Sequence, residues 1–145
     1  AYLIHGTSFM KDGKAYFMTG AIGADFDLRM RSLDLATATW QTLGDFPGEG
    51  RWFASGFALG GYGVVTSGQG KEPIDERTSM YVPVRDTWIY DTQTDAWEQI
   101  NDAPGEAAYL RTTISNGDLV LLGCGRSMNG LLKECWTGRM GMVIE

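Results

Sequence analysis

The chain is poor in the residues that build metal centres and nucleophilic active sites. Its 145 residues include one histidine, His5, and two cysteines, Cys124 and Cys135. The sequence contains no zinc-ligand spacing, no serine nucleophile elbow and no phosphate-binding glycine loop. It therefore predicts no catalytic residue, no metal site and no cofactor within this chain, and we interpret His5 as structural or channel-lining.

Positive charge and long apolar runs are also scarce. Twelve lysines and arginines stand against 18 aspartates and glutamates, which leaves a net charge of −6. Because a negative chain repels a phosphate backbone, we expect no nucleic-acid partner. No apolar run reaches the roughly 18 residues of a spanning helix, so we expect no membrane span. The length fits one domain, since domains commonly have about 100–200 residues.

Glycine, by contrast, is abundant, and a repeat organises the chain. The 20 glycines and only 4 prolines are typical of a folded, turn-rich protein. When residues 34–49 are aligned with residues 91–106, a shift of 57 positions, seven of the 16 positions are identical, including Trp40 with Trp97. Such self-similarity indicates a duplicated structural unit.

Three glycine-centred dipeptides predict three β-hairpins. They are Asp12–Gly13, Gly60–Gly61 and Asn116–Gly117. Each pair tolerates the positive φ angles of a type I′ turn. The apolar runs around them predict paired strands at 4–10 with 15–19, 53–59 with 62–67, and 111–115 with 119–122. Third strands are expected at 29–35, 86–91 and 133–138, and fourth strands at 39–43 and 96–100.

The residues of these units resemble the kelch repeat in its bacterial form. The resemblance is carried by Arg-Asp-Thr-Trp-Ile-Tyr-Asp-x-x-Thr-x-x-Trp at 85–97 and by Phe-Pro-Gly-x-x-Arg at 46–51, and it covers nearly the whole chain. It implies an all-β fold, a partial kelch-type β-propeller of about three four-stranded antiparallel blades. Blade 1 would span about 1–45, blade 2 about 50–101 and blade 3 about 107–145, with its fourth strand missing. Ala108 replaces the arginine seen at Arg51, so no ring of arginines around the channel is implied.

Three blades do not close a ring, because propellers generally have four to eight. The remaining blades have two alternative sources. They belong to the same longer chain, of which this is a fragment, as the missing initiator Met and missing last strand favour. Alternatively, a second copy completes the ring as a homodimer.

The two cysteines are expected to flank the loop between the second and third strands of blade 3. A disulfide between Cys124 and Cys135 and a pair of buried thiols are the two alternatives. The disulfide and the bacterial form of the repeat would fit a secreted or periplasmic protein.

Function is expected on the loops, which a rigid scaffold positions. Residues 69–84 are predicted to be the longest loop, and the kelch resemblance implies that this loop emerges on the same face as the connections between blades. The candidate ligand-binding residues are charged or aromatic: Glu49, Arg51, Trp52, Glu72, Arg77, Tyr81, Arg85, Glu106 and Tyr109. This mixture suits a sugar or a peptide, and an ordinary solvated loop is the alternative.

Three functional hypotheses follow. The first is a binding module for a protein or carbohydrate ligand, without turnover. The second comes from the kelch resemblance, because some kelch relatives oxidise sugars with copper or epimerise sialic acid. The chain would then be part of an epimerase-like or galactose-oxidase-like enzyme whose catalytic residues lie partly outside it. The third is a purely structural role.

Overall fold

The computed structural model describes residues 4–140 and 142–144, and every helix or strand assigned within them is a β-strand. Three antiparallel sheets have four strands each. Sheet 1 consists of β1 (Thr7–Lys11), β2 (Lys14–Met18), β5 (Arg31–Asp34) and β6 (Thr39–Thr42). Sheet 2 consists of β7 (Ser55–Leu59), β8 (Tyr62–Pro73), β9 (Ser79–Asp91) and β10 (Ala96–Ile100). Sheet 3 consists of β11 (Thr112–Ser115), β12 (Val120–Gly123), β15 (Cys135–Arg139) and β16 (Met142–Ile144).

Two short hairpins complete the described elements. β3 (Ala21–Ile22) pairs with β4 (Asp25–Phe26), and β13 (Arg126–Ser127) pairs with β14 (Gly130–Leu131). Each hairpin connects the second strand of its sheet to the third. The all-β prediction is confirmed.

Two of the three turns between first and second strands lie at the predicted glycine dipeptides, and the third turn is displaced by one residue. Asp12 and Gly13 have φ angles of 50° and 74°, and Gly60 and Gly61 have 58° and 88°, as a type I′ turn requires. In sheet 3 the Asn116 amide instead donates to the Leu119 carbonyl, which leaves Gly117 and Asp118 as the central residues. Only Gly117 has a positive φ there, typical of a type II′ turn. The turn of the third hairpin therefore lies one residue further along the chain than the predicted Asn116–Gly117 dipeptide.

The turns before the repeated tryptophans are closed by aspartate. Asp34 Oδ1 accepts hydrogen bonds from the Ala36 and Thr37 amides, and Asp91 Oδ1 accepts one from Gln93. These hydrogen bonds from backbone amides to an aspartate side chain replace the strand-to-strand hydrogen bonds where the chain reverses. The repeated Asp and Trp of the sequence therefore mark the third and fourth strands of sheets 1 and 2.

Two predicted features differ from the structure. Residues 69–84 are not an open loop, because β8 and β9 continue past a bulge at Thr66/Gly68 and remain paired as far as Pro73 with Ser79. Sheet 3 also has a fourth strand where none was expected, since β16 pairs with β15. This strand is short and lacks the tryptophan motif, so its sequence gave no signal.

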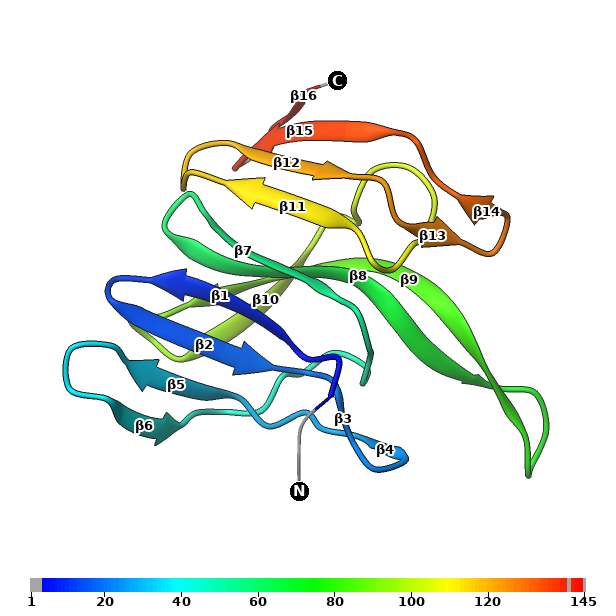
Figure 1. Ribbon diagram of the computed structural model, residues 1–145, viewed down its shortest axis with the longest axis horizontal. Coiled ribbons are helices and arrows are strands. Elements are labelled where there is room, and N and C mark those ends of the chain that lie inside the picture. Colours follow the sequence, from blue (N-terminus) through cyan, green and yellow to red (C-terminus); the bar gives the residue numbers. More distant parts are fainter. Residues whose placement is uncertain (1–3, 141, 145) are drawn as a thin grey trace.

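The three sheets meet at their innermost strands and lie face to face, like blades of a propeller (Figure 1). The Gly60 amide at the end of β7 donates to the Gly117 carbonyl beyond β11 at 2.7 Å. At the other boundary, a Cβ at Gly56 would lie 2.5 Å from the Ser8 carbonyl oxygen of β1. The absence of side chains at such positions lets the inner strands approach closely.

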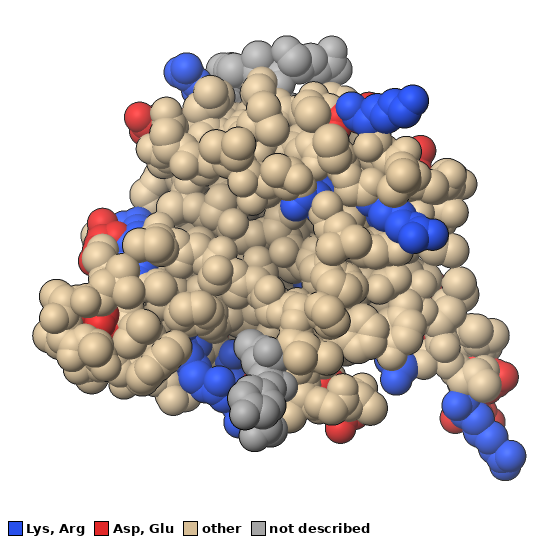
Figure 2. All heavy atoms as spheres, viewed as in Figure 1, with Lys and Arg blue, Asp and Glu red and all other residues tan. Residues whose placement is uncertain are grey.

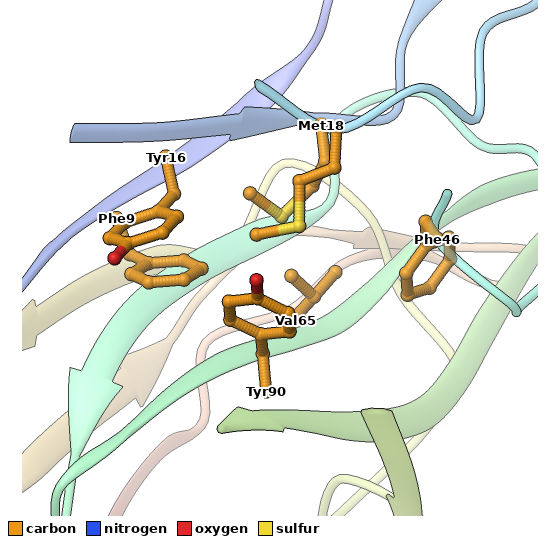
Figure 3. Close-up of a cluster of buried hydrophobic side chains, with 7 residues drawn as sticks. Phe9, Tyr16, Met18, Phe46, Val65 and Tyr90 are labelled. Carbon is orange, nitrogen blue, oxygen red and sulfur yellow. The ribbon is translucent and has the colours of Figure 1, made fainter. Parts of the chain in front are cut away.

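The main core lies between sheets 1 and 2 (Figure 3). Its buried members are Phe9, Tyr16, Met18, Met30, Phe46, Val65 and Tyr90. The Phe9 and Tyr16 rings stack with centroids 4.8 Å apart. A second, smaller cluster of Phe57, Leu59, Val64 and Val120 joins sheets 2 and 3. Within the described residues, no helix is long and apolar enough to span a bilayer.

Candidate ligand-binding face

One end of the three sheets carries all three hairpins that link second to third strands. The β3–β4 hairpin, the outer half of the β8–β9 hairpin and the β13–β14 hairpin project from this end, on the right-hand side of Figure 1. We call this end, which is the candidate site for ligand binding, the binding face. Charged side chains gather at the tip of the long β8–β9 hairpin, at the lower right of Figure 2, whereas the middle of that view is mostly uncharged.

Strained backbone marks the places where neighbouring sheets join at this face. His5, Phe53 and Leu110 occupy equivalent positions before the inner strands, and their φ angles are 55°, 54° and 56°. The Phe53 amide donates to the His5 carbonyl at 3.2 Å, and the Leu110 amide donates to the Phe53 carbonyl at 3.3 Å. Residues other than glycine adopt this conformation at a cost of about 1–3 kcal/mol, and they cluster at functional sites.

A contiguous row of aromatic rings lies beside these joints. The Trp52 indole stacks on the Tyr81 ring, with centroids 4.6 Å apart and planes 29° apart. The centroid of the Phe53 ring lies 6.5 Å from that of Trp52 and 6.0 Å from that of Tyr109. The His5 ring centroid lies 4.3 Å from that of Phe53. We call His5, Trp52, Phe53, Tyr81 and Tyr109 the aromatic row. Tyr81 is 40% exposed, so the row has an open end.

The backbone holds the row in place. Trp52 and Gln69 exchange two backbone hydrogen bonds, of 3.0 and 2.8 Å, and Tyr109 and Arg126 do the same at 3.0 and 2.9 Å. Beyond Gln69 the β8–β9 hairpin reverses, and its second strand, β9, places Tyr81 against Trp52. The structure therefore brings together three of the predicted site residues, Trp52, Tyr81 and Tyr109.

Arg51 does not belong to this surface, although the sequence analysis placed it there. It is only 1% exposed, and its guanidinium bonds Asp86 through Nη1 to Oδ1 and through Nη2 to Oδ2 at 2.8 Å. Its Nε also donates to the Glu49 carbonyl at 3.0 Å. These bonds anchor the guanidinium inside the protein, at the wall of the groove that Glu49 and Arg85 also line, and away from the aromatic row.

The Asp86 carboxylate is held ionised by these contacts. Burial raises its pKa, but the hydrogen bonds and charge of Arg51 and a hydrogen bond from Trp88 outweigh burial, so the net pKa is below its ordinary value. Trp88 Nε1 donates to Asp86 Oδ2 at 2.7 Å. The group therefore behaves as a fixed anion between sheets and not as a proton donor near neutral pH.

Glu49 and Arg85 line a different hollow, outside the aromatic row. This groove of about 510 Å³ also contains Asp102 and Trp88. The Arg85 Nε donates to Asp102 Oδ2 at 3.1 Å, and its Nη1 donates to the Gly105 carbonyl at 3.1 Å. Both ion-pair partners are about half exposed, so the pair contributes little to stability.

The remaining predicted site residues are dispersed. Glu72 and Arg77 are exposed near the tip of the long hairpin, where the Arg77 and Thr78 amides both donate to Asp75 Oδ1 at 2.8 Å. Glu106 is exposed, and its Oε2 accepts from Asn129 Nδ2 at 3.2 Å. The nine candidates therefore form at least three separate groups rather than one site.

The structure shows Cys124 and Cys135 as free, exposed thiols, which corresponds to neither of the two alternatives, a disulfide or a pair of buried thiols. Cys135 pairs in register with Gly123, one residue before Cys124. Cys124 follows the end of β12 and has a φ angle of 56°. Within residues 4–140, no group of three or more His, Cys, Asp or Glu side chains forms a metal-binding cluster.

Sequence reasoning missed two residues of the binding face. Arg126 is exposed and is bonded through its backbone to Tyr109. It follows Cys124–Gly125 as Gln69 follows Ser67–Gly68, so the repeat held a signal for it. Phe53 lies next to Trp52, but nothing in its sequence context indicates that it continues the aromatic row.

Comparisons with known proteins point to sugar-related propellers. No protein-family model matches the chain. The N-acetylneuraminate epimerase of Yersinia enterocolitica serotype O:8 / biotype 1B is 31% identical over 121 residues, 82% of this chain and 30% of that protein. The N-acetylneuraminate epimerase of Vibrio cholerae serotype O1 is 31% identical over 97 residues, 66% of this chain and 24% of that protein.

A solved structure, "Structure of YjhT", has the same fold. It matches with a TM-score of 0.72 at 22% identity, over 89% of this chain and 36% of that chain. This likeness confirms the partial β-propeller, and the curated relatives support the kelch-like propeller family predicted from the sequence. The chain spans about a third or less of the length of these proteins.

Proposed function

We propose that the binding face takes up a carboxylated sugar, and that this sugar is N-acetylneuraminate. The aromatic row carries the proposal, because stacked rings with an open end offer the apolar face on which the C–H face of a sugar ring packs. Trp52 and Tyr81 would provide that platform. Both curated relatives are named for N-acetylneuraminate.

A carboxylated sugar also needs a cation, since the chain as a whole is negative. Arg126 is an exposed guanidinium bonded through its backbone to Tyr109. A guanidinium can donate two parallel hydrogen bonds to a carboxylate, which gives both strength and orientation. We therefore assign carboxylate recognition to Arg126 and ring packing to Trp52 and Tyr81.

A test by ligand-observed NMR separates these two contributions. The probes are N-acetylneuraminate and its methyl ester, in which an uncharged –CO2CH3 group replaces the ionised carboxylate. We expect saturable binding of the acid, with a dissociation constant on the order of millimolar, and binding of the ester at least several-fold weaker. Arg126→Gln should remove the difference between the probes, with Lys14→Gln, in sheet 1 and away from the face, as the control. Equal binding of both probes by the unmodified chain would overturn the carboxylate assignment.

A second candidate is part of an epimerase active site completed by residues outside this chain. The names of the two curated relatives favour it. Epimerisation requires groups that give and take protons, and the exposed His5 and Glu106 side chains are candidates on this face. We expect the 145-residue chain to bind the sugar without accelerating the interconversion of its epimers, measured by exchange NMR. Acceleration by this chain would show that it holds the catalytic groups itself.

A further inference from the structure

Sheets 1 and 3 form the two ends of the stack, and the outer face of sheet 3 is equivalent to the face of sheet 1 that packs on sheet 2 (Figure 1). Phe9 and Tyr16 are the third pair of opposed residues counted from their turn, and they are buried in the main core. Ile114 and Leu121 are the third pair in sheet 3, and they are exposed. Over its first three strands, sheet 3 therefore presents to solvent the face by which sheet 1 joins sheet 2.

The outer face of sheet 1 is equivalent, in turn, to the face of sheet 2 that packs on sheet 1. Leu33 of β5 pairs with Trp40 of β6. The shift of 57 residues between the repeats leads from this pair to Tyr90 and Trp97, which pair in sheet 2 and pack at the main core with ring centroids 4.8 Å apart. Trp40, by contrast, is exposed, and Leu33 is partly exposed. Sheet 1 therefore leaves open the face by which sheet 2 joins sheet 1.

The buried interface between sheets 1 and 2 shows which residues would meet if the two open faces came together. In that interface the centroid of the Tyr90 ring lies 6.4 Å from that of Phe9. Leu33 takes the place of Tyr90 on the open face of sheet 1. Ile114 takes the place of Phe9 on sheet 3, so joining the open faces would bring Leu33 against Ile114. Two aliphatic side chains would be removed from water there, which favours association.

Differences of side-chain size between the buried and the open faces run in both directions. In the buried interface a Cβ added at Gly63 would lie 2.1 Å from Phe9 Cζ. Ala15 is the counterpart of Gly63 and carries that methyl group, while a shorter isoleucine replaces the phenylalanine. Further exchanges from buried to open face are Met18 to Gly123, Met30 to Cys135, Trp88 to Arg31, Val65 to Phe17, Ala58 to Met10 and Gly56 to Ser8. Arg31 brings its own counterion, since its Nη2 lies 4.0 Å from Asp27 Oδ2.

Backbone groups at the joints between sheets supply a matching donor and acceptor at the two ends. The Phe53 amide donates to the His5 carbonyl, and the Leu110 amide donates to the Phe53 carbonyl. All three residues have positive φ angles and precede the inner strands of sheets 1, 2 and 3. The next bond of this series would run from the His5 amide of a second copy to the Leu110 carbonyl. Leu110 is 54% exposed, so a partner can reach this joint.

We propose that two copies of this chain associate head to tail, with sheet 3 of each copy packed on sheet 1 of the other. A partner that covers both open faces must itself carry both, and a second copy does. The two contacts are identical by two-fold symmetry, and three four-stranded sheets from each copy give six, within the four to eight of closed propellers. Association uses neither Arg126 nor Trp52, so this proposal and the proposed sugar binding succeed or fail separately.

Sedimentation equilibrium of the 145-residue chain tests the association itself. We expect a species of twice the 15.9 kDa of one chain, with a dissociation constant on the order of micromolar. No larger species should form at higher concentration, because a closed pair leaves neither face open. A monomer at roughly 100 µM, or a series of growing oligomers, would overturn the proposal.

A charge-swap cycle tests which faces meet. Ile114→Lys places a cation on sheet 3, and Leu33→Glu places an anion on sheet 1. Each variant alone should raise the dissociation constant of the dimer at least about tenfold, because an unpaired charge is buried in both contacts. The double variant should return to within about threefold of the unmodified chain, because each contact then pairs lysine with glutamate. Ile74→Lys, at the exposed tip of the long hairpin, is the matched control and should change nothing.

Two results with these variants would contradict head-to-tail packing. If the double variant dimerises no better than the weaker single variant, sheet 3 does not meet sheet 1, and the copies join through like faces. If circular dichroism shows that Leu33→Glu does not fold, Trp40→Glu, at an exposed position of the same face, decides instead. An unchanged dissociation constant in Trp40→Glu would exclude sheet 1 from the contact.

Discussion

Arg51 and Asp86, 35 residues apart in the sequence, form a two-point ion pair between the sheet 1–sheet 2 connection and β9. The Arg51 side chain is 1% exposed and that of Asp86 is 24% exposed. The guanidinium also lies over the Phe46 ring, with 5.2 Å from its central carbon to the ring centroid. The pair therefore fixes the segment that precedes the aromatic row, and its loss would be felt at both the core and the binding face.

Removal of the Asp86 charge should destabilise the protein. In Asp86→Asn the buried guanidinium loses its counterion, and we expect the free energy of unfolding to fall by about 2–3 kcal/mol. Urea denaturation at pH 7 measures this change. Asp102→Asn, at the exposed pair with Arg85, is the matched control and should cost less than about 1 kcal/mol.

The same pair should make stability depend on acid pH. Because the pKa of Asp86 is lowered in the folded state, its contribution is complete above the unfolded value of 3.8 and is lost as pH falls through the lower folded value. The difference in unfolding free energy between the unmodified chain and Asp86→Asn should therefore shrink between pH 5 and the acid limit of folding. A difference that does not change with pH would contradict the assignment.

Gly63 should be intolerant of a side chain because of its contact with Phe9. A Cβ at position 63 would lie 2.1 Å from Phe9 Cζ, inside the core between sheets 1 and 2. Gly63→Ala should lower stability by about 1–3 kcal/mol through overpacking. Phe9→Leu should be less harmful in the Gly63→Ala background than alone, because it frees the space that the methyl group needs. Additive effects in this double-mutant cycle would argue against the predicted clash.

The outer faces of sheets 1 and 3 should promote self-association of the isolated chain. Ile114 and Leu121 are directly opposed on sheet 3 and are 69% and 37% exposed, and Trp40 on sheet 1 is 57% exposed. Exposed apolar patches of this kind mark interaction surfaces. Analytical ultracentrifugation should show concentration-dependent association that Ile114→Lys weakens. A monomer at all concentrations would show that these faces stay solvated.

Tyr81 should contribute to sugar binding while Tyr62 should not. Tyr81 stacks on Trp52, whereas Tyr62 lies beside the Gly60–Gly61 turn at the opposite end of β8. Tyr81→Ala should weaken N-acetylneuraminate binding about fivefold, by removing half of the platform. Tyr62→Ala, the matched control, should leave the affinity unchanged while losing a similar side chain. Equal losses in both variants would indicate a general effect on folding.

Most of the strand plan could be predicted from the sequence. Turn chemistry at Asp12–Gly13 and Gly60–Gly61 and the aspartates before Trp40 and Trp97 are local signals, and each fixes a strand pair by itself. The long β8–β9 hairpin was missed because its charged residues and Pro73 resemble a loop. Its pairing depends on cross-strand hydrogen bonds that composition does not report.

The site was predicted less well, for a physical reason. The burial of Arg51 depends on Asp86, and the exposure of Tyr81 depends on the way the long hairpin returns to Trp52; neither contact is local in sequence. The signal for Arg126 was present in the repeat, since it takes the place of Gln69. Residue type identified Trp52, Tyr81 and Tyr109, but only the fold separates them from Glu49 and Arg85.

Amide and indole chemical shifts measured during a titration with N-acetylneuraminate locate the sugar on the protein. We expect the largest changes on the backbone amides of Phe53, Tyr81, Tyr109 and Arg126 and on the Trp52 indole N–H. Changes concentrated at the hairpin tip around Glu72 and Arg77, or in the groove of Glu49 and Arg85, would contradict this expectation, as would the absence of saturable changes.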